Sequence, residues 1–143
     1  MGGEAITYSN VNVDSSNAAA IYIANEGSPY YTYSSNSVSV LGGILTHSNT
    51  NSTVDHGAIV LYSARPGFTL QNLLIDGLQI SDTRATASRQ VGVLSDGGTV
   101  AGAMLRGLTF LRGGTVFGAN VPAASYSTVN WVVNGVARPD HLA

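Results

Sequence analysis

Asp14 and His47 are spaced so that a carboxylate could lie beside an imidazole. They end two similar strand-like phrases, Asn10–Asp14 and Gly43–His47, which begin 33 positions apart. Such a pair can act as a general acid and base. A surface hydrogen bond is the alternative explanation for the same spacing. We therefore treat both residues as candidates for contact with a substrate.

Glu26 and Asp96 are the candidate catalytic carboxylates. Each follows a strand of the same repeated type, with Arg65 beside the equivalent position of the intervening repeat. Two stacked repeats would separate the carboxylates by about 9–10 Å, near the upper end of the roughly 6.5–9.5 Å used by inverting glycosidases. The alternative is a pair of loop carboxylates beside Gly27 and Gly97.

An aromatic cluster and a histidine motif complete the candidates. Tyr30, Tyr31 and Tyr33 lie within the insertion 27–36. Their rings could stack on sugars, or they could pack over the edge of the domain. Asp55-His56-Gly57 could supply a proton-transfer histidine or begin a strand. The sequence contains no metal-ligand cluster, phosphate-binding glycine loop or nucleophile elbow, so no cofactor is expected.

These residues must be positioned by a repeat. The opening phrase returns four times, at steps of 33, 34 and 30 positions, as Asn10–Asp14, Gly43–His47, Gly77–Ser81 and Gly107–Leu111. A period of roughly 20–50 residues is typical of solenoids. β-Branched and aromatic residues alternate with polar ones between turn residues, which predicts strands, and no segment has a sustained helical period.

Three families of short strands follow one another in a repeated order. The families are 6–14, 42–47, 73–81 and 104–111; then 20–24, 58–62 and 90–94; then 37–41, 68–72 and 99–104. This order predicts an all-β parallel β-helix, a solenoid of about three to four coils. An antiparallel sandwich is the alternative, but Asp96-Gly97 is the only plausible hairpin dipeptide that the pattern offers.

The predicted domain spans 1–136, with 115–136 as an atypical last coil or cap and 137–143 as a frayed tail. Two inward columns are predicted, namely Val11, Ile44, Leu78 and Leu108, followed by Val13, Thr46, Ile80 and Phe110. This register also places Asp76 opposite Arg106 and Asp82 opposite Arg112, as cross-strand pairing favours.

Composition limits the function classes. Hydrophobic residues make up 44% of the 143 residues, charged residues only 10%, and the net charge is −2. No nucleic-acid partner and no membrane span are therefore expected. The uncapped start before Ile6 predicts that another chain, a homo-oligomer or the rest of a longer β-helix covers this edge. We expect an excised fragment of an extracellular protein.

The strand phrases resemble the right-handed parallel β-helix superfamily of pectate lyases and polygalacturonases. The resemblance covers 6–111 and rests on phrases such as Ile6–Asp14, Ala20–Ile23 and Asn72–Ile80. Within that superfamily the chain is most similar to bacterial family 87 glycoside hydrolases, the α-1,3-glucanases and mycodextranases. The signatures Asn-Thr-Asp, Asp-Asp and Arg-x-Lys are absent, so the resemblance transfers no catalytic residue.

The resemblance implies a polysaccharide-directed domain, a fragment of a secreted glycoside hydrolase that acts on a glucan-type polymer. Under this interpretation Tyr30, Tyr31, Tyr33 and Arg65 contact the glycan together with the Asp14–His47 pair. A structural or adhesive β-helix, as in a phage tail fibre or a surface adhesin, is the alternative function.

Overall fold

The computed structural model describes residues 5–25, 35–51, 57–84, 91–95, 98–111, 116–117 and 121–143. This part of the chain is almost entirely β-structure, which confirms the all-β class. The strands are β1 (Ile6–Asp14), β2 (Ile21–Asn25), β3 (Ser35–Thr46), β4 (Ile59–Ser63), β5 (Thr69–Ser81), β6 (Val91–Ser95), β7 (Thr99–Ala101), β8 (Ala103–Arg106), β9 (Thr109–Leu111), β10 (Tyr126–Val129), β11 (Val132–Val133) and β12 (Val136–Ala137), with a 3-10 turn η1 (Ala123–Ser125).

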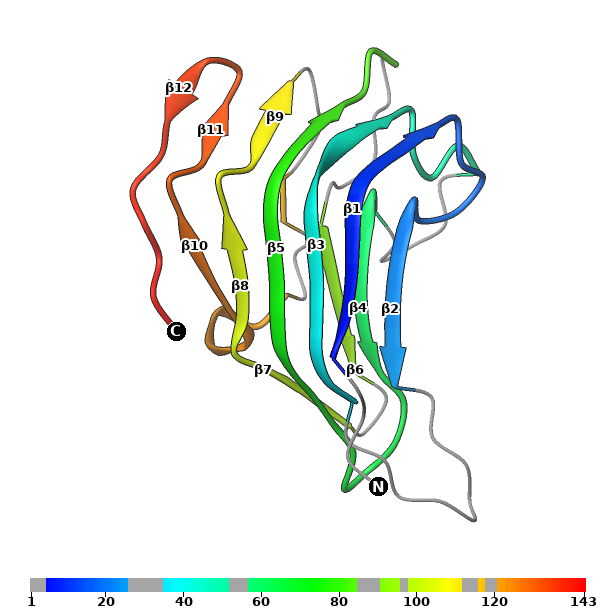
Figure 1. Ribbon diagram of the computed structural model, residues 1–143, viewed down its shortest axis with the longest axis vertical. Helices are drawn as coiled ribbons and strands as arrows, with labels where there is room; N and C mark the ends of the chain where they lie inside the picture. Colours follow the sequence, from blue (N-terminus) through cyan, green and yellow to red (C-terminus); the bar gives the residue numbers. More distant parts are fainter. Residues whose placement is uncertain are drawn as a thin grey trace.

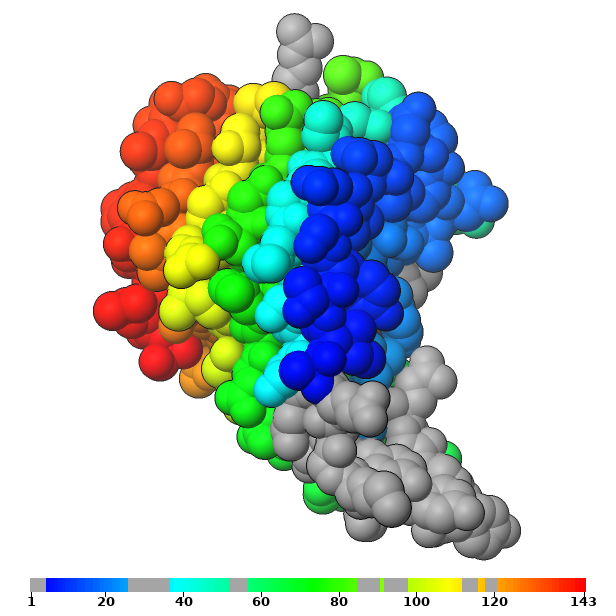
Figure 2. Space-filling view, in the orientation of Figure 1, coloured from blue at the N-terminus to red at the C-terminus, as the bar shows by residue number. Residues whose placement is uncertain are grey.

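The chain alternates between two sheets, whose strands are parallel except for β12. β1, β3 and β5 lie side by side in a nine-stranded sheet, and β2, β4 and β6 form a three-stranded sheet behind them (Figure 1). The space-filling view shows the strands of the larger sheet following sequence order, from β1 to the C-terminal strands (Figure 2). Each strand therefore pairs with the equivalent strand of the preceding pass of the chain.

The core lies between these two sheets. Along β5 the buried residues Leu73, Ile75, Leu78 and Ile80 alternate with more exposed neighbours, as one inward-facing side of a strand requires. They join one cluster with Ile59 and other buried residues of the smaller sheet. Burial of aliphatic side chains at roughly 25 cal/mol per Å² supplies the main drive for this stacking.

The larger sheet bends along a column of residues in the left-handed backbone conformation. The column consists of Asn10, Gly42, Gly77, Gly107 and Asn130, with φ between 53° and 70°. Glycine and asparagine adopt this conformation more readily than other residues. One glycine or asparagine with positive φ thus bends each of these strands at an equivalent position.

Two further columns mark the other bends. Ser37, Asn72 and Gly102 occupy equivalent positions with φ between 55° and 67°. Ser15 and His47 occupy equivalent positions beyond the ends of β1 and β3, with φ of 60° and 50°. The second of these bends places His47 at a corner of the fold.

The register of the smaller sheet agrees with the sequence prediction. Ile21 pairs with Ile59, which pairs with Val91, and the flanking positions follow in step. In the larger sheet the predicted pairing of Asp76 with Arg106 is also confirmed, at 2.6 Å between carboxylate and guanidinium.

The register predicted for the second phrase is wrong by one residue. Gly42, and not Gly43, is equivalent to Gly77. As a result Leu45 is fully buried in the core, whereas Ile44 is 46% exposed. The predicted inward position of Ile44 is therefore corrected to an outward one.

Close backbone approach at Gly43 explains this correction. Gly43 has φ of +135°, and a Cβ there would lie 2.0 Å from the carbonyl oxygen of Val11. Only glycine fits such a contact. Gly43 therefore takes the inward position between Val11 and Leu78, and Thr46 points outward instead of into the core.

The end of the chain departs from the parallel pattern. Phe117 stacks on Tyr126 at 4.7 Å between ring centroids, and Trp131 meets the edges of Phe117 and Phe110 at 5.7 and 6.3 Å. Edge-to-face and offset-stacked pairs of this kind contribute about 0.5–1.5 kcal/mol each beyond their buried area. These rings lie at the C-terminal end of the core.

A hairpin that the sequence interpretation overlooked follows this aromatic cluster. β11 and β12 pair antiparallel around Asn134-Gly135, with φ of 49° and 79° at the two turn residues. An Asn-Gly pair with both φ values positive is the usual two-residue hairpin connection. The view that 96–97 was the only plausible hairpin dipeptide is therefore corrected.

Residues 137–143 are not a frayed tail. The backbone of His141 exchanges two hydrogen bonds with Thr128, at 2.7 and 2.9 Å. The indole Nε1 of Trp131 donates to the carbonyl of Pro139 at 2.8 Å. The segment thus lies along the outer edge of the last parallel strands and supplies partners for their backbone groups.

At the opposite end the described residues leave part of the core uncovered. Ile6 and Tyr8 of β1 are 46% and 55% exposed, although Tyr8 is equivalent to Val40, which is buried. A hollow of about 210 Å³, lined by apolar side chains that include Val11 and Ile21, lies between β1 and β2. The two ends of the described structure therefore differ in how the core is covered.

Candidate functional site

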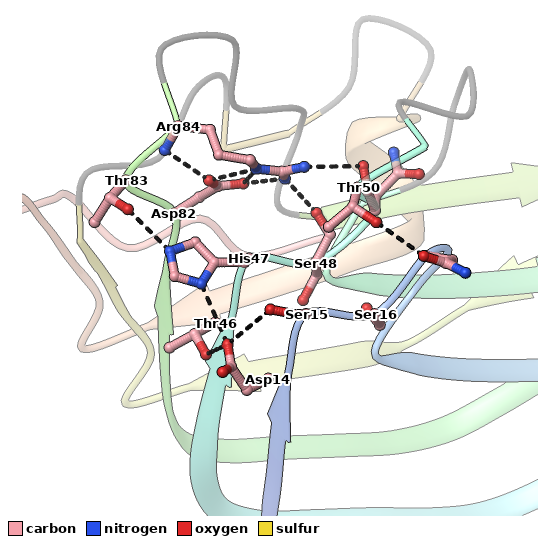
Figure 3. A network of polar contacts seen from close by, with 12 residues as sticks. Asp14, Ser15, Ser16, Thr46, His47, Ser48, Thr50, Asp82, Thr83 and Arg84 are labelled. Atoms are coloured by element: carbon pink, nitrogen blue, oxygen red, sulfur yellow. Dashed lines mark hydrogen bonds and ion pairs between the residues drawn. The ribbon is translucent and has the colours of Figure 1, made fainter.

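A cluster of polar side chains lies where β1, β3 and β5 end (Figure 3). Parallel strands bring their carboxyl ends to the same edge of a sheet, so residues from three passes of the chain meet there. We call this cluster the polar corner, and its central members are Asp14, Thr46, His47, Asp82, Thr83 and Arg84.

His47 connects an acidic group to a hydroxyl group within the polar corner. Its Nδ1 lies 3.2 Å from Oδ1 of Asp14, and its Nε2 lies 2.9 Å from Oγ1 of Thr83. The simplest neutral tautomer donates from Nδ1 to the carboxylate and accepts the threonine hydroxyl at Nε2. The imidazole is 36% exposed, so solvent and ligands reach it.

Hydroxyl donors hold the carboxylate of Asp14 in place. Thr46 Oγ1 donates to Asp14 Oδ1 at 2.5 Å, and Ser15 Oγ donates to the same oxygen at 3.3 Å. The hydrogen bond from Thr46, followed by that from His47, holds the pKa of Asp14 below its ordinary value of 3.8. At neutral pH this exposed carboxylate therefore carries a full negative charge.

A second arrangement, between Asp82 and Arg84, anchors the polar corner. Asp82 is only 2% exposed, and Arg84 Nε donates to its two carboxylate oxygens at 2.8 and 3.0 Å. Arg84 Nη2 also donates to the carbonyl of Ser48 at 2.5 Å. This arginine therefore ties the segment after β3 to the segment after β5, and so fixes Thr83 between two restrained neighbours.

The Asp82 carboxyl gives the fold a predictable response to acid. Burial acts to raise its pKa, but the hydrogen bonds from Arg84 outweigh burial, so its pKa lies below 3.8. A carboxyl with a lowered folded-state pKa stabilises the fold above its unfolded pKa. That stabilisation is lost as the pH falls from about 4 through the folded-state pKa.

We therefore expect the difference in unfolding free energy between the wild type and Asp82→Asn to shrink as the pH is lowered from 6 to about 3. Urea unfolding, followed by circular dichroism across this range, measures the difference. A difference that stays constant with pH would contradict the charged Asp82–Arg84 pair.

The structure places the other sequence candidates as follows. Arg65 is exposed in the turn between β4 and β5, where its carbonyl accepts a hydrogen bond from Phe68 N at 3.1 Å. The strand residues Asn25 and Ser95, which precede two of the candidates, occupy equivalent positions through Ser63. The remaining candidates lie outside the described residues, namely Glu26, Tyr30, Tyr31, Tyr33, His56 and Asp96.

The predicted contact between Asp14 and His47 is present, but the two residues do not share one column, because Asp14 pairs with Thr46. The sequence interpretation did not include Thr83 and Arg84. Arg112, the partner predicted for Asp82, lies outside the described residues, and the carboxylate binds Arg84. The available signal was the tripeptide that starts at Asp82, which directly follows a strand of the repeat.

No three His, Asp or Glu side chains of the described segments are arranged to hold a metal ion. Within the same segments no helix has the length and apolar character needed to cross a bilayer. Comparison with known proteins found no matching family model, curated relative or solved structure. The function must therefore be argued from the fold and the polar corner.

Proposed function

We propose that this chain is a segment of a right-handed parallel β-helix related to the pectate-lyase-like superfamily. The support is the alternation of successive strands between two parallel sheets, with bends at equivalent positions. Parallel crossover connections are right-handed in about 98% of cases. Under this proposal the family 87 glycoside hydrolases are functional relatives.

The proposed function is contact with a polysaccharide, as part of a secreted glycoside hydrolase that acts on a glucan-type polymer. The observation that carries the proposal is the polar corner, where a carboxylate, an imidazole and a hydroxyl are aligned and accessible. Sugar hydroxyls both donate and accept hydrogen bonds, and these three groups match them.

The outer face of the larger sheet extends this surface with neutral polar groups. Thr7, Ser9, Asn12 and Gln79 are exposed on β1 and β5. The exposed Leu41 and Ile44 and the Asp76–Arg106 ion pair lie on the same face. Polar and apolar groups with a balanced ion pair suit an uncharged polymer better than an ionic one. Glu26 and Asp96 remain the proposed catalytic carboxylates, and the three tyrosines 30, 31 and 33 remain proposed sugar contacts.

Binding to a glycan array identifies the polymer, and variants of the polar corner then test the site. We expect Asp14→Asn and His47→Gln each to weaken binding about tenfold, because each removes one hydrogen-bonding group at the surface. Arg138→Gln is the matched control, because Arg138 is exposed on the C-terminal segment. Equal binding by all four proteins would exclude the polar corner as the glycan site.

The partly uncovered end of the core favours a second candidate, a structural or adhesive β-helix. The exposed Ile6 and Tyr8 and the adjoining hollow are apolar surface that a further coil or subunit would cover. Mass measurement in solution separates the two functions. A stable trimer that binds no glycan supports the structural candidate and contradicts the polysaccharide proposal.

A further inference from the structure

We propose that the polar corner hydrolyses acyl esters, with Thr83 as the nucleophile, His47 as the general base and Asp14 as the residue that positions His47. This activity goes beyond polysaccharide contact and does not depend on it. The substrate class is an ester of a small carboxylic acid, whether the alcohol belongs to a sugar or to another molecule.

The geometry that carries the proposal is the single chain of contacts from carboxylate to imidazole to hydroxyl. The distances of 3.2 Å from Asp14 to Nδ1 and 2.9 Å from Nε2 to Thr83 lie within the reach that a nucleophile, its base and an orienting group require. The order of roles also matches the acid–histidine–hydroxyl arrangement of hydrolases, which recurs on unrelated folds. Asp14, His47 and Thr83 come from three successive passes of the chain.

The surroundings hold each group in its role. Thr46 donates to the carboxylate of Asp14, which keeps that group in place beside Nδ1. The flanking amides of Thr83 are both engaged, because Asp82 N donates to Leu111 O at 3.2 Å and Arg84 N donates to Asp82 Oδ1 at 3.0 Å. Thr83 itself is exposed, so an ester can approach its hydroxyl.

The N–H of Thr83 has no acceptor within the described residues. Among these residues, therefore, no group competes for this donor with the negative charge that develops on an attacked carbonyl oxygen. The amide of the nucleophile itself serves this purpose in other acyl-transfer sites.

The reaction has two balanced halves. Thr83 Oγ1 attacks the acyl carbon while its proton moves to Nε2 of His47. The bond from the acyl carbon to the alcohol oxygen then breaks, and the alcohol leaves with that proton. Water repeats the sequence: it gives a proton to Nε2, attacks the acyl-threonine, and releases the carboxylic acid as Thr83 recovers its proton from Nε2.

Hydrolysis of p-nitrophenyl acetate by the full chain tests the proposal. We expect release of p-nitrophenol faster than with free imidazole at the same concentration. Thr83→Ala and His47→Gln should each lose at least about 100-fold of the protein-dependent rate, whereas Thr83→Ser should retain activity. His141→Gln is the matched control: the ring of His141 bonds a backbone carbonyl, Ala123 O, and within the described residues it lacks a carboxylate–hydroxyl pair like that of His47.

The positioning role of Asp14 is tested by a measurement that a general loss of structure would not reproduce, namely the separate effects on kcat and KM. We expect Asp14→Asn to lower kcat while KM changes little, because the carboxylate supports the charged imidazole of the transition state and does not touch the ester. Circular dichroism establishes that each variant is folded.

Mass spectrometry of acid-quenched reactions gives a second, direct measurement. We expect one acetyl group on the peptide that contains Thr83, and none in Thr83→Ala. The proposal is overturned if the wild type is no faster than imidazole, or if Thr83→Ala retains the wild-type rate. Neither outcome bears on glycan binding, because the probe contains no sugar.

Discussion

Arg84→Met is expected to lower the free energy of unfolding by about 3 kcal/mol. The substitution leaves the carboxylate of Asp82, which is 2% exposed, without the cation that bonds both of its oxygens. Removal of one partner of a buried ion pair costs about 3–5 kcal/mol, and the partial exposure of Arg84 places the effect at the lower end. Urea unfolding at pH 7 measures the loss.

The control for this prediction is Arg138→Met, which removes an exposed arginine of the C-terminal segment and should change stability by less than about 0.5 kcal/mol. The double variant Asp82→Asn/Arg84→Met should recover part of the loss, since it no longer buries an unpaired charge. A loss below about 1 kcal/mol in Arg84→Met would show that Asp82 does not depend on this partner.

Gly43→Ala is expected to destabilise the fold by about 2–4 kcal/mol. An added Cβ would lie 2.0 Å from the carbonyl oxygen of Val11, and the φ of +135° at Gly43 is itself unfavourable for alanine. Both β1 and β3 would have to shift to relieve the contact, and these strands hold the Asp14–His47 pair. Urea unfolding at pH 7 measures the change.

Gly67→Ala is the matched control for the close approach. Gly67 also has a positive φ, of +82°, but no atom lies within 4 Å of the added Cβ. We expect it to lose only about 1 kcal/mol, from backbone strain alone. Equal losses in the two variants would mean that the contact with Val11 contributes nothing.

The sequence allowed prediction of the strands and of the register where the pattern was unambiguous. In β2, β4 and β6 the buried Ile21, Ile59 and Val91 occupy equivalent positions, and the aliphatic pattern around them favours one alignment. In β3 the adjacent Gly42 and Gly43 allow two alignments. The correct one depends on contact with Val11 of another strand, which no local pattern encodes.

For the polar corner, too, the sequence allowed prediction only of the residues that belong to the repeated phrases. Asp14 ends β1 and pairs with Thr46 of β3, so the repeat brings His47 only to the neighbouring position, and the left-handed backbone at His47 accompanies its contact with Asp14. Thr83 and Arg84 follow β5, after the repeated phrase has ended. Their positions depend on how this segment turns and on the backbone carbonyls that Arg84 binds, Ser48 O among them. These are tertiary contacts between segments without any shared sequence pattern.

The pairing of every parallel strand with its equivalent in the preceding pass also determines how the chain can fold. Val13 pairs with Leu45, Ile21 pairs with Ile59, and Thr109 pairs with Val132, so every parallel ladder joins residues more than about 20 positions apart. Such contacts require closure of a long loop before they stabilise anything, which slows folding. Once the aromatic C-terminal end has formed, its edge strands offer ordered backbone N–H and C=O groups with which the strands of the next pass can pair. We therefore expect folding to proceed from that end toward β1, with the β1 end the last to form and the first to unfold.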